Sequence, residues 1–389
     1  MKIAQSLSTN PSLDAAAEEV GAELAAALGG EAPHLVVAFA TLPHAGSFAR
    51  LHQVLAPVVR GGVLFGCSAS GAIGGRREVE RGAALSVWAA RLPGAIVAPL
   101  RWECREEGGG FVYDGWDSLE GVAAPAAFLL LVDPFSNVPE MLFDGLAERF
   151  GPVPICGGIS SGGTMPGTNA LFLGAETYRH GTVGVAISGQ VAVRPVVSQG
   201  CRPIGRHYVV TEAKENVLYK IAGQPALARF QEVFQALSPE DRDLARRALH
   251  VGRVVDEYRD TFGRGDFLIR NCIGIDPDRG AILVNDRFRR GQTVQFHVRD
   301  AASATEDLGL LLDQEAPPGL AGALLFTCSG RGTHLFGKPD HDASMVQDRL
   351  GPVPLAGFFA NGEIGPVAGR TCLHGFTASL ALFAPATRD

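Results

Sequence analysis

A short glycine-bounded phrase occurs three times in this chain, each time directly after a short apolar run. Its copies are Gly66-Cys67-Ser68-Ala69-Ser70-Gly71, Gly157-Gly158-Ile159-Ser160-Ser161-Gly162 and Gly357-Phe358-Phe359-Ala360-Asn361-Gly362. Each copy lies roughly 25–30 residues beyond another apolar run, which is the spacing of two strands joined by a helix. Because parallel strands require such a crossover, this repetition predicts buried, partly parallel sheets.

The apolar runs place the expected elements. First strands are expected at 35–40, 128–132 and 324–327, and second strands at 62–65, 153–156 and 353–356. Helices are expected between them, around Leu51 and near 139–150 and 343–350. The second and third copies also share the lead-in Gly-Pro-Val-Pro, at Gly151–Pro154 and Gly351–Pro354, which indicates a duplicated half. We therefore predict an α/β fold of two related halves built from repeated β-α-β units, with mixed, largely buried sheets.

The length of 389 residues favours two domains over one core. Residues 1–30 are expected to hold a helix, with Ser12 as its N-cap and Gly29-Gly30 as its end. One domain is then expected over 31–205 and a second over 238–389. The junction between them, 206–237, contains Gly223-Gln224-Pro225-Ala226, in which proline suits the first turn of a helix.

Composition argues against several classes of protein. There are 34 Lys plus Arg against 41 Asp plus Glu, a net charge of −7, which is the wrong sign for a nucleic-acid-binding protein. The longest apolar run, 122–132, is about half of what a bilayer span needs, so we expect no membrane insertion. Seven cysteines without paired spacing indicate free thiols and a cytoplasmic location. No CxxC or HExxH motif occurs, and no metal or cofactor is expected.

The third copy of the phrase is the candidate ligand loop. Asn361, Gly362 and Glu363 stand where the first copy has Ser70, Gly71 and Ala72, so only this copy carries a carboxylate. A ligand amine would gain a partner there, and the flanking glycines let the backbone approach a ligand closely. The alternative is that all three copies are only tight turns. A phosphate-binding loop is rejected, because Ala72 stands where its lysine should be.

Arg331 follows the strand that opens the third repeat. Loops at the carboxyl ends of parallel strands meet above a sheet, so we expect Arg331 and Glu363 to face one crevice. Arginine can hold a ligand carboxylate in bidentate fashion while the glutamate accepts from an amine. An ion pair between the two residues is the alternative.

Three further candidates lie in the middle of the C-terminal half. They are Arg270, Arg299 and Asp300. Arg270 follows Leu268-Ile269, which places its stem in the interior, where a guanidinium needs a carboxylate neighbour or an anionic ligand. Structural pairing, for example with Asp300, remains the alternative to ligand binding.

Cys328 is the one candidate nucleophile. It lies three residues before Arg331 and six before His334. A neighbouring cation lowers a thiol pKa, and a Cys–His pair can carry acyl transfer. A buried cysteine that acts as a small apolar residue is the alternative.

Several motifs carry a resemblance to a known family. The C-terminal motifs are Phe267–Asn271, Gly291–Asp300, Phe326–Gly332, Ala356–Pro366 and His374–Thr377, and these resemble a FIST C-terminal domain. The phrase at Gly66–Gly71 resembles the matching FIST N-terminal domain, and Gly223–Ala226 resembles the junction between the two. Together the match covers nearly the whole chain.

The resemblance implies an intracellular sensory module for small ligands, for which amino acids have been suggested. No output domain is visible beside the two FIST-like parts, so we expect a separate downstream signalling protein. Our interpretation is a protein that binds a small polar metabolite without transforming it. The alternatives are a cysteine-dependent hydrolase or acyltransferase that uses Cys328, and a scaffold that binds only protein.

Overall fold

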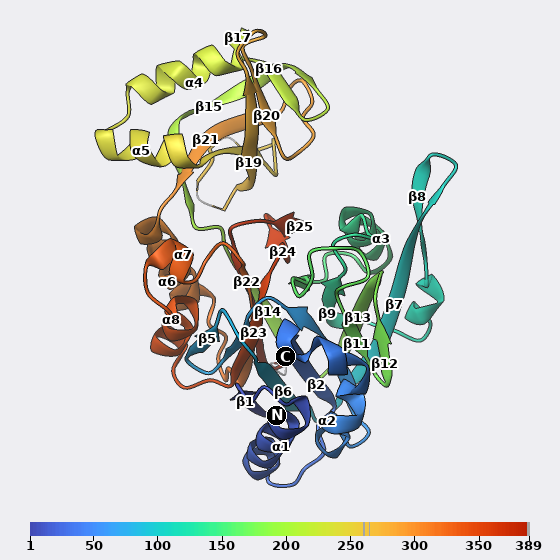
Figure 1. Cartoon of the computed structure of the whole chain (residues 1–389). Coiled ribbons are helices and arrows are strands. Elements are labelled where there is room, and N and C mark those ends of the chain that lie inside the picture. The colour runs from blue at the N-terminus through green and yellow to red at the C-terminus, as the bar shows by residue number, and fades with distance from the viewer. Residues whose placement is uncertain (260, 264, 387–389) are drawn as a thin grey trace. The chain divides into compact units, whose positions relative to one another are not determined.

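The computed structural model describes residues 1–259, 261–263 and 265–386 and has a mixed α/β structure (Figure 1). Its chain divides into two compact units. The large unit comprises Met1–Val197, Gly309–Pro366 and Thr371–Asp389, and the small unit comprises Ser198–Leu308 and Val367–Arg370. Much of the expected 238–389 domain therefore lies in one unit with residues 1–197.

Three parallel strand pairs organise the large unit. They are β2 (Leu35–Thr41) with β3 (Val63–Ala69), β9 (Pro125–Val132) with β10 (Ile155–Ile159), and β22 (Gly322–Cys328) with β23 (Leu355–Ala360). Helices connect the members of each pair: η1 (Leu42–Arg50) and α2 (Leu51–Val59), then α3 (Pro139–Phe150), then α7 (Thr333–Phe336) and α8 (His341–Leu350). Each glycine-bounded phrase begins within β3, β10 or β23 and runs past the end of that strand, so each phrase stands at the carboxyl end of a pair.

A short hairpin follows each phrase and pairs with a strand of a different pair. The hairpins are β4 (Ala72–Gly74) with β5 (Arg77–Val79), β11 (Leu171–Leu173) with β12 (Glu176–Tyr178), and β24 (Glu363–Val367) with β25 (Arg370–His374). Strand β4 pairs with β23, β11 pairs with β3, and β24 pairs with β10. Every pair thus receives its next strand from another part of the chain, and the three sheets are interlocked.

Antiparallel strands complete the other side of each sheet. Next to the first strands lie β6 (Leu85–Arg91), β13 (Thr182–Gly189) and β26 (Ala378–Pro385). Beyond them lie β1 (Lys2–Ser8), β7 (Ala95–Glu107) with β8 (Gly110–Asp114), and β14 (Val191–Ser198). The 3-10 helix η2 (Trp116–Leu119) precedes β9, and α6 (Ala301–Glu315) precedes β22.

Apolar side chains from all three sheets form one inner core. Phe39, Phe326 and Phe358 lie in it, with ring centroids of Phe39 and Phe358 4.8 Å apart. The other face of the first sheet is covered by α1 (Leu13–Leu28) and α2 (Figure 1). The sequence predicted the ends of α1 correctly: Ser12 accepts from Ala15 N, and Gly29 has φ 65°.

The described residues of the small unit form antiparallel strands, the helices α4 (Ala226–Gln235) and α5 (Pro239–Arg247), and the first half of α6. Its strand order is β15 (Cys201–Lys214), β21 (Thr293–Arg299), β18 (Leu249–Val254), β19 (Phe267–Asp276), β20 (Ala281–Val284), β16 (Val217–Ile221), β17 (Gln224–Pro225). An additional pairing between β15 and β16 closes six of these strands into a ring. The helices α4 and α5 contribute Val233 and Ala245 to its core.

Within the described part of the chain, no helix combines the length and the apolar character that crossing a membrane would require.

Candidate functional site

The fold brings the three glycine-bounded phrases together. Asn361 N donates to Ile159 O at 3.1 Å, Ile159 N donates to Gly362 O at 2.8 Å, and Phe359 N donates to Gly71 O at 3.1 Å. Each of these bonds joins two different copies of the phrase. We call this place the loop junction and define it as residues 68–71, 159–162, 329 and 359–362.

Serine hydroxyls connect the phrases further. Ser161 Oγ accepts from Ser70 N at 2.9 Å and donates to Phe359 O. Ser329, which directly follows β22, adds a fourth segment: its Oγ donates to Ala360 O at 2.9 Å and lies 3.5 Å from Ser70 Oγ. The four segments are therefore held in one hydrogen-bonded arrangement.

A buried polar network supports the loop junction on its interior side. Ser160 Oγ lies 2.7 Å from Ser68 O and 3.1 Å from Asn169 Oδ1. Asn169 also accepts from Gly163 N at 2.8 Å, and its amide lies 3.4 Å from an oxygen of Asp133. Because buried polar groups are costly when unpaired, such a network favours one loop conformation.

The first glycine of each phrase is required by close strand packing. A Cβ at Gly66, Gly157 or Gly357 would lie 1.8–1.9 Å from a carbonyl oxygen of the neighbouring parallel strand. No side chain fits at such a distance. The three phrases therefore share a structural constraint as well as a sequence pattern.

Three polar side chains of the junction remain exposed: Ser70, Ser329 and Asn361. They come from three separate segments and offer hydroxyl and amide groups that both donate and accept. Gly362 beside them is buried, and its Cβ position would meet Leu373 and Ile159. The exposed layer of the junction thus carries no formal charge and suits a small polar ligand.

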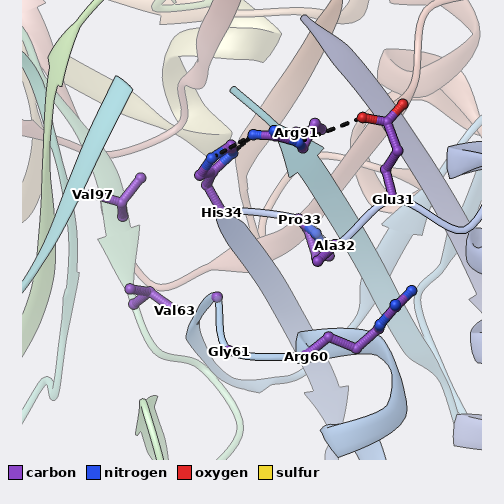
Figure 2. Close-up of a pocket in the computed structure, with 10 residues that line it drawn as sticks. Glu31, Ala32, Pro33, His34, Arg60, Gly61, Val63, Arg91 and Val97 are labelled. Atoms are coloured by element: carbon purple, nitrogen blue, oxygen red, sulfur yellow. Dashed lines mark hydrogen bonds and ion pairs between the residues drawn. The ribbon is translucent and has the colours of Figure 1, made fainter. Parts of the chain in front are cut away.

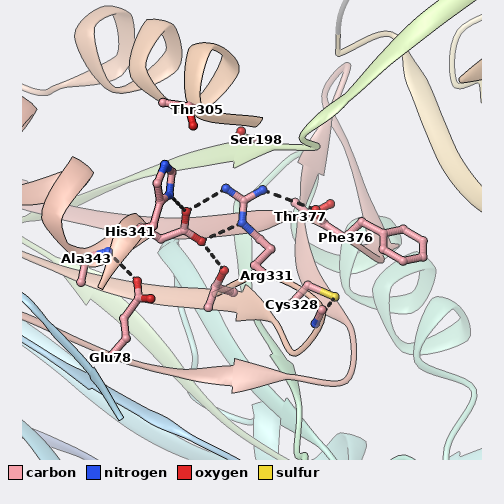
Figure 3. A network of polar contacts seen from close by, with 12 residues as sticks. Glu78, Ser198, Thr305, Cys328, Arg331, His341, Ala343, Phe376 and Thr377 are labelled. Carbon is pink, nitrogen blue, oxygen red and sulfur yellow. Dashed lines mark hydrogen bonds and ion pairs between the residues drawn. The ribbon is translucent and has the colours of Figure 1, made fainter. Parts of the chain in front are cut away.

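Arg331 lies buried beside the junction and is paired within the fold (Figure 3). Its Nε and Nη2 donate to the two oxygens of Asp342 at 2.7 and 2.8 Å, which is bidentate geometry. Asp342 also accepts from Thr327 Oγ1 at 2.7 Å and lies 2.9 Å from His341 Nδ1. The Asp342 carboxylate thus occupies the position beside Arg331 where the sequence predicted a ligand carboxylate.

The charge of Asp342 is stabilised by this arrangement. Burial alone would raise the pKa of its carboxyl, but the Arg331 guanidinium and the hydrogen bonds from Arg331, His341 and Thr327 hold that pKa well below its usual range. Asp342 therefore stays ionised wherever the protein is folded near neutral pH.

Glu363 is also fully buried, at the start of β24. Its Oε2 accepts from Thr377 N at 3.0 Å, and Thr377 O in turn accepts from Cys328 N at 2.9 Å. Glu363 is therefore connected through Thr377 to the carboxyl end of β22, where Arg331 and Ser329 follow.

A third buried carboxyl, Glu78 on β5, adjoins Asp342. Glu78 Oε1 accepts from Ala343 N at 2.7 Å in the first turn of α8 (Figure 3). Glu78 N donates to Asp340 Oδ1 at 2.6 Å. Burial and the nearby Asp342 charge raise the pKa of Glu78 to about 8. Glu78 is therefore mostly protonated at neutral pH.

The three candidates of the small unit have different neighbours. Arg270 Nε lies 3.6 Å from Asp286, which also accepts from Arg253. Asp300 accepts from Arg202 at 2.9 Å and from Ser303 N at 2.7 Å in the first turn of α6.

Arg299 lies beside His250. Burial and the Arg299 charge together lower the pKa of His250 to about 4. Within the small unit, the three candidates thus lie in separate polar groups.

Cys328 is half-buried at the end of β22. Its Sγ accepts from Gly330 N at 3.5 Å. In the described part of the chain, no group of three or more His, Cys, Asp or Glu side chains could hold a metal ion.

Sequence reasoning missed several residues of the site. Ser70, Ser329 and Asn169 were not singled out, and Asp342 was overlooked as the partner of Arg331. One signal could have found Asp342: a buried arginine requires a carboxylate, and Asp342 stands in the first turn of α8, the second helix after Arg331.

Interlocked mixed sheets that gather their strand-end loops at one polar junction define this chain as a mixed α/β protein. Models of the FIST N domain and the FIST C domain match residues 34–224 and 226–366. Together they cover most of the chain, which therefore belongs to the FIST family. FIST domains are generally sensory domains that bind small ligands in signalling.

Similar proteins occur in mycobacteria. An uncharacterized protein of Mycobacterium tuberculosis (strain H37Rv) is 42% identical over 386 residues, which covers 98% of this chain and 100% of that protein. An uncharacterized protein of Mycobacterium bovis is 40% identical over 386 residues, covering 98% of this chain and 99% of that protein. The similarity therefore extends over both FIST domains.

Proposed function

We propose that this protein is a sensor that binds a small polar metabolite, an amino acid or a similar compound, at the loop junction. A separate partner protein receives the signal. One observation carries the proposal: exposed Ser70, Ser329 and Asn361 converge from three segments on a hydrogen-bonded, buried base. Convergent polar groups on a rigid support are typical of ligand sites.

The proposed roles follow from burial. Asn361, with an amide that donates and accepts, and the two serine hydroxyls contact the ligand. Gly362 supports them from the interior, because its Cβ position would meet Leu373 and Ile159. Arg331 and Glu363 position the surrounding loops, because both are buried and bonded within the fold. Direct binding of a ligand carboxylate by Arg331 would require its pair with Asp342 to open.

Signalling would start from the interlocked hairpins. The phrase after β23 leads directly into β24, which pairs with β10, so a ligand that shifts Asn361 also acts on a second sheet. Such a ligand can shift the protein between two conformations only if it binds one of them with higher affinity than the other. A partner that recognises one arrangement would then read ligand occupancy.

The test is a thermal-shift screen of amino acids and related carboxylates, followed by calorimetry on each hit. Asn361→Ala and Ser70→Ala should each weaken binding about tenfold, the effect of losing one or two hydrogen bonds. Gln53→Ala, which removes an exposed amide on α2, is the matched control and should bind normally.

Three results would contradict the proposal in different ways. Equal affinity in Asn361→Ala and wild type would exclude the junction as the site. No thermal shift with any compound would favour a scaffold that binds only protein. Selective labelling of Cys328 by an activity probe, with turnover lost in Cys328→Ala, would favour a hydrolase or acyltransferase.

A further inference from the structure

A cavity of about 570 Å³ opens at the amino ends of β2 and β3 in the large unit (Figure 2). Both strands run from this cavity to the loop junction, so the two sites lie at opposite ends of the same strand pair. Its apolar side consists of Ala32, Pro33, Val63 and Val97, and its polar side consists of Glu31, His34, Arg60 and Arg91.

His34 presents a donor to this cavity. Leu92 N donates to His34 Nδ1 at 2.8 Å, so Nδ1 is an acceptor and the neutral ring carries its proton on Nε2. Burial and the nearby Arg91 charge lower the pKa of His34, which keeps the ring neutral. A second proton on Nδ1 would also oppose the Leu92 N–H.

Arg91 adds further donors at the same corner. Its Nη1 lies 2.5 Å from His34 Nε2 and 3.0 Å from Nδ1 (Figure 2). The imidazole and the guanidinium therefore lie side by side and present their donors at one corner of the cavity. Glu31 is the nearby carboxylate, but it lies 3.5 Å from Arg91 Nε, and its side chain is 55% exposed. An acceptor-rich group in the cavity would satisfy both donors.

Arg60 is kept at a position that disfavours arginine. It ends α2 with φ 47°, a left-handed conformation that costs free energy for any residue with a Cβ. The other two crossovers have glycine at the corresponding place: Gly151 after α3, with φ 77°, and Gly351 after α8, with φ 81°. The first crossover instead carries a cation at this place, Arg60, which lines the cavity. Its Nη1 donates to Gly30 O at 2.6 Å, which holds the guanidinium against the end of α1 beside the cavity.

We propose that this cavity binds a small organic anion with an apolar body, a carboxylate or a phosphate monoester. Arg60, Arg91 and His34 Nε2 bind the anionic head, and two cations against the single Glu31 carboxylate give the site a net positive charge. The apolar body packs on Val63, Val97 and Pro33. The site is independent of the loop junction and of the ligand proposed there.

The test uses the full-length protein and isothermal titration calorimetry with benzoate, phenyl phosphate and benzylamine. Both anions share their apolar ring with the cationic benzylamine, so the comparison isolates head-group charge. At least one anion should bind and benzylamine should not; the stronger anion identifies the head group as carboxylate or phosphate.

Two variants locate the binding. Arg60→Gly and Arg91→Gln should each weaken anion binding about tenfold or more, as expected when a charge-assisted hydrogen bond is lost. Arg76→Gln is the matched control, because Arg76 is an exposed arginine paired with Asp348 outside the cavity. Arg60→Gly restores the residue found after α3 and α8, so it should fold and should melt no lower than wild type.

Binding of benzylamine as tight as that of the anions would overturn the proposal, as would the absence of binding by both anions. Unchanged affinity in Arg60→Gly would also overturn it. Asn361→Ala should leave anion binding intact; loss of binding in that variant would assign the anion to the loop junction instead. This last result separates failure of this inference from failure of the proposed function.

Discussion

The buried pair of Arg331 and Asp342 gives the sharpest stability prediction. Asp342→Asn keeps the shape of the side chain but removes the charge that faces a guanidinium of which 0% is exposed. Removing one partner of a buried ion pair costs roughly 3–5 kcal/mol, because the remaining charge stays buried without compensation. At about 2 °C per kcal/mol for a unit of this size, the midpoint of thermal unfolding should fall by roughly 6–10 °C.

Chemical denaturation at pH 7, followed by tryptophan fluorescence, measures this loss. The matched control is Asp348→Asn on the same helix, where the Asp348 carboxylate pairs with Arg76 and both side chains are more than half exposed. A surface pair of this kind contributes less than about 1 kcal/mol. The reasoning would be refuted if both variants lost the same small amount of stability.

The double variant Arg331→Met/Asp342→Leu sharpens the test. Because it removes both charges, it should lose less stability than the sum of the losses in Arg331→Met and Asp342→Leu. Additive losses would show that the two side chains contribute separately, through packing rather than through their pairing.

Three further predictions concern glycine packing and titration. Gly357→Ala should destabilise the large unit by about 3 kcal/mol or more, because the added Cβ would lie 1.9 Å from Leu325 O. The control is Gly375→Ala, where the added Cβ would meet open space and the stability should not change. Denaturant midpoints of the two variants measure the difference. The raised pKa of Glu78 means that its stabilising contribution is complete below about pH 4.5 and is lost as the pH rises through about 8. Glu78→Gln should therefore flatten the decline of stability across that window, and a slope equal to that of wild type would contradict the assignment. The pKa of His297 is lowered to about 4 by burial, so its contribution is complete above about pH 6.5 and is lost as the pH falls through about 4. Hydrogen exchange in β21 should accelerate over that range, and His297→Phe should reduce this dependence, with His250 on β18, whose pKa is also about 4, accounting for the remainder.

The local elements could be read from the sequence because their causes are local. The apolar runs at 35–40, 128–132 and 324–327 lie within β2, β9 and β22, and the capping residues of α1 were predicted from residue type alone. The burial of an apolar run and the capping of a helix end depend on residues adjacent in the sequence, so both can be predicted from the sequence.

The pairing of the hairpins could not be read in this way. β4 and β11 have three residues each, and β4 finds its partner β23 more than 250 residues further along the chain, with Gly74 opposite Ala356. The hydrophobic pattern of a three-residue strand is too short to specify a pairing partner at such a distance in the sequence. The convergence of the three phrases could therefore not be predicted from the sequence.

The positions of some candidate residues in the fold were predictable from the sequence. The third phrase was singled out for Asn361 and Glu363, and the structure puts the first at the surface of the junction and the second beneath it. Whether Arg331 would face a ligand or a partner depends on the first turn of α8, where Asp342 lies. Residue spacing from one strand end to the next does not contain that information.

The interlocked hairpins limit how this protein can be divided into separately expressed fragments. The boundary between the two family models, near residue 225, separates β4 from β23 and β24 from β10, although each couple shares hydrogen bonds. An N-terminal fragment that ends there would lack the strands beside β4 and β10, and the complementary fragment would lack those beside β23 and β24. Neither fragment should be made as a separate domain for crystallisation or screening. Co-expressed, however, the two fragments should reassemble, and fused to the halves of a reporter they would form a split sensor whose assembly is encoded in the strand exchange itself.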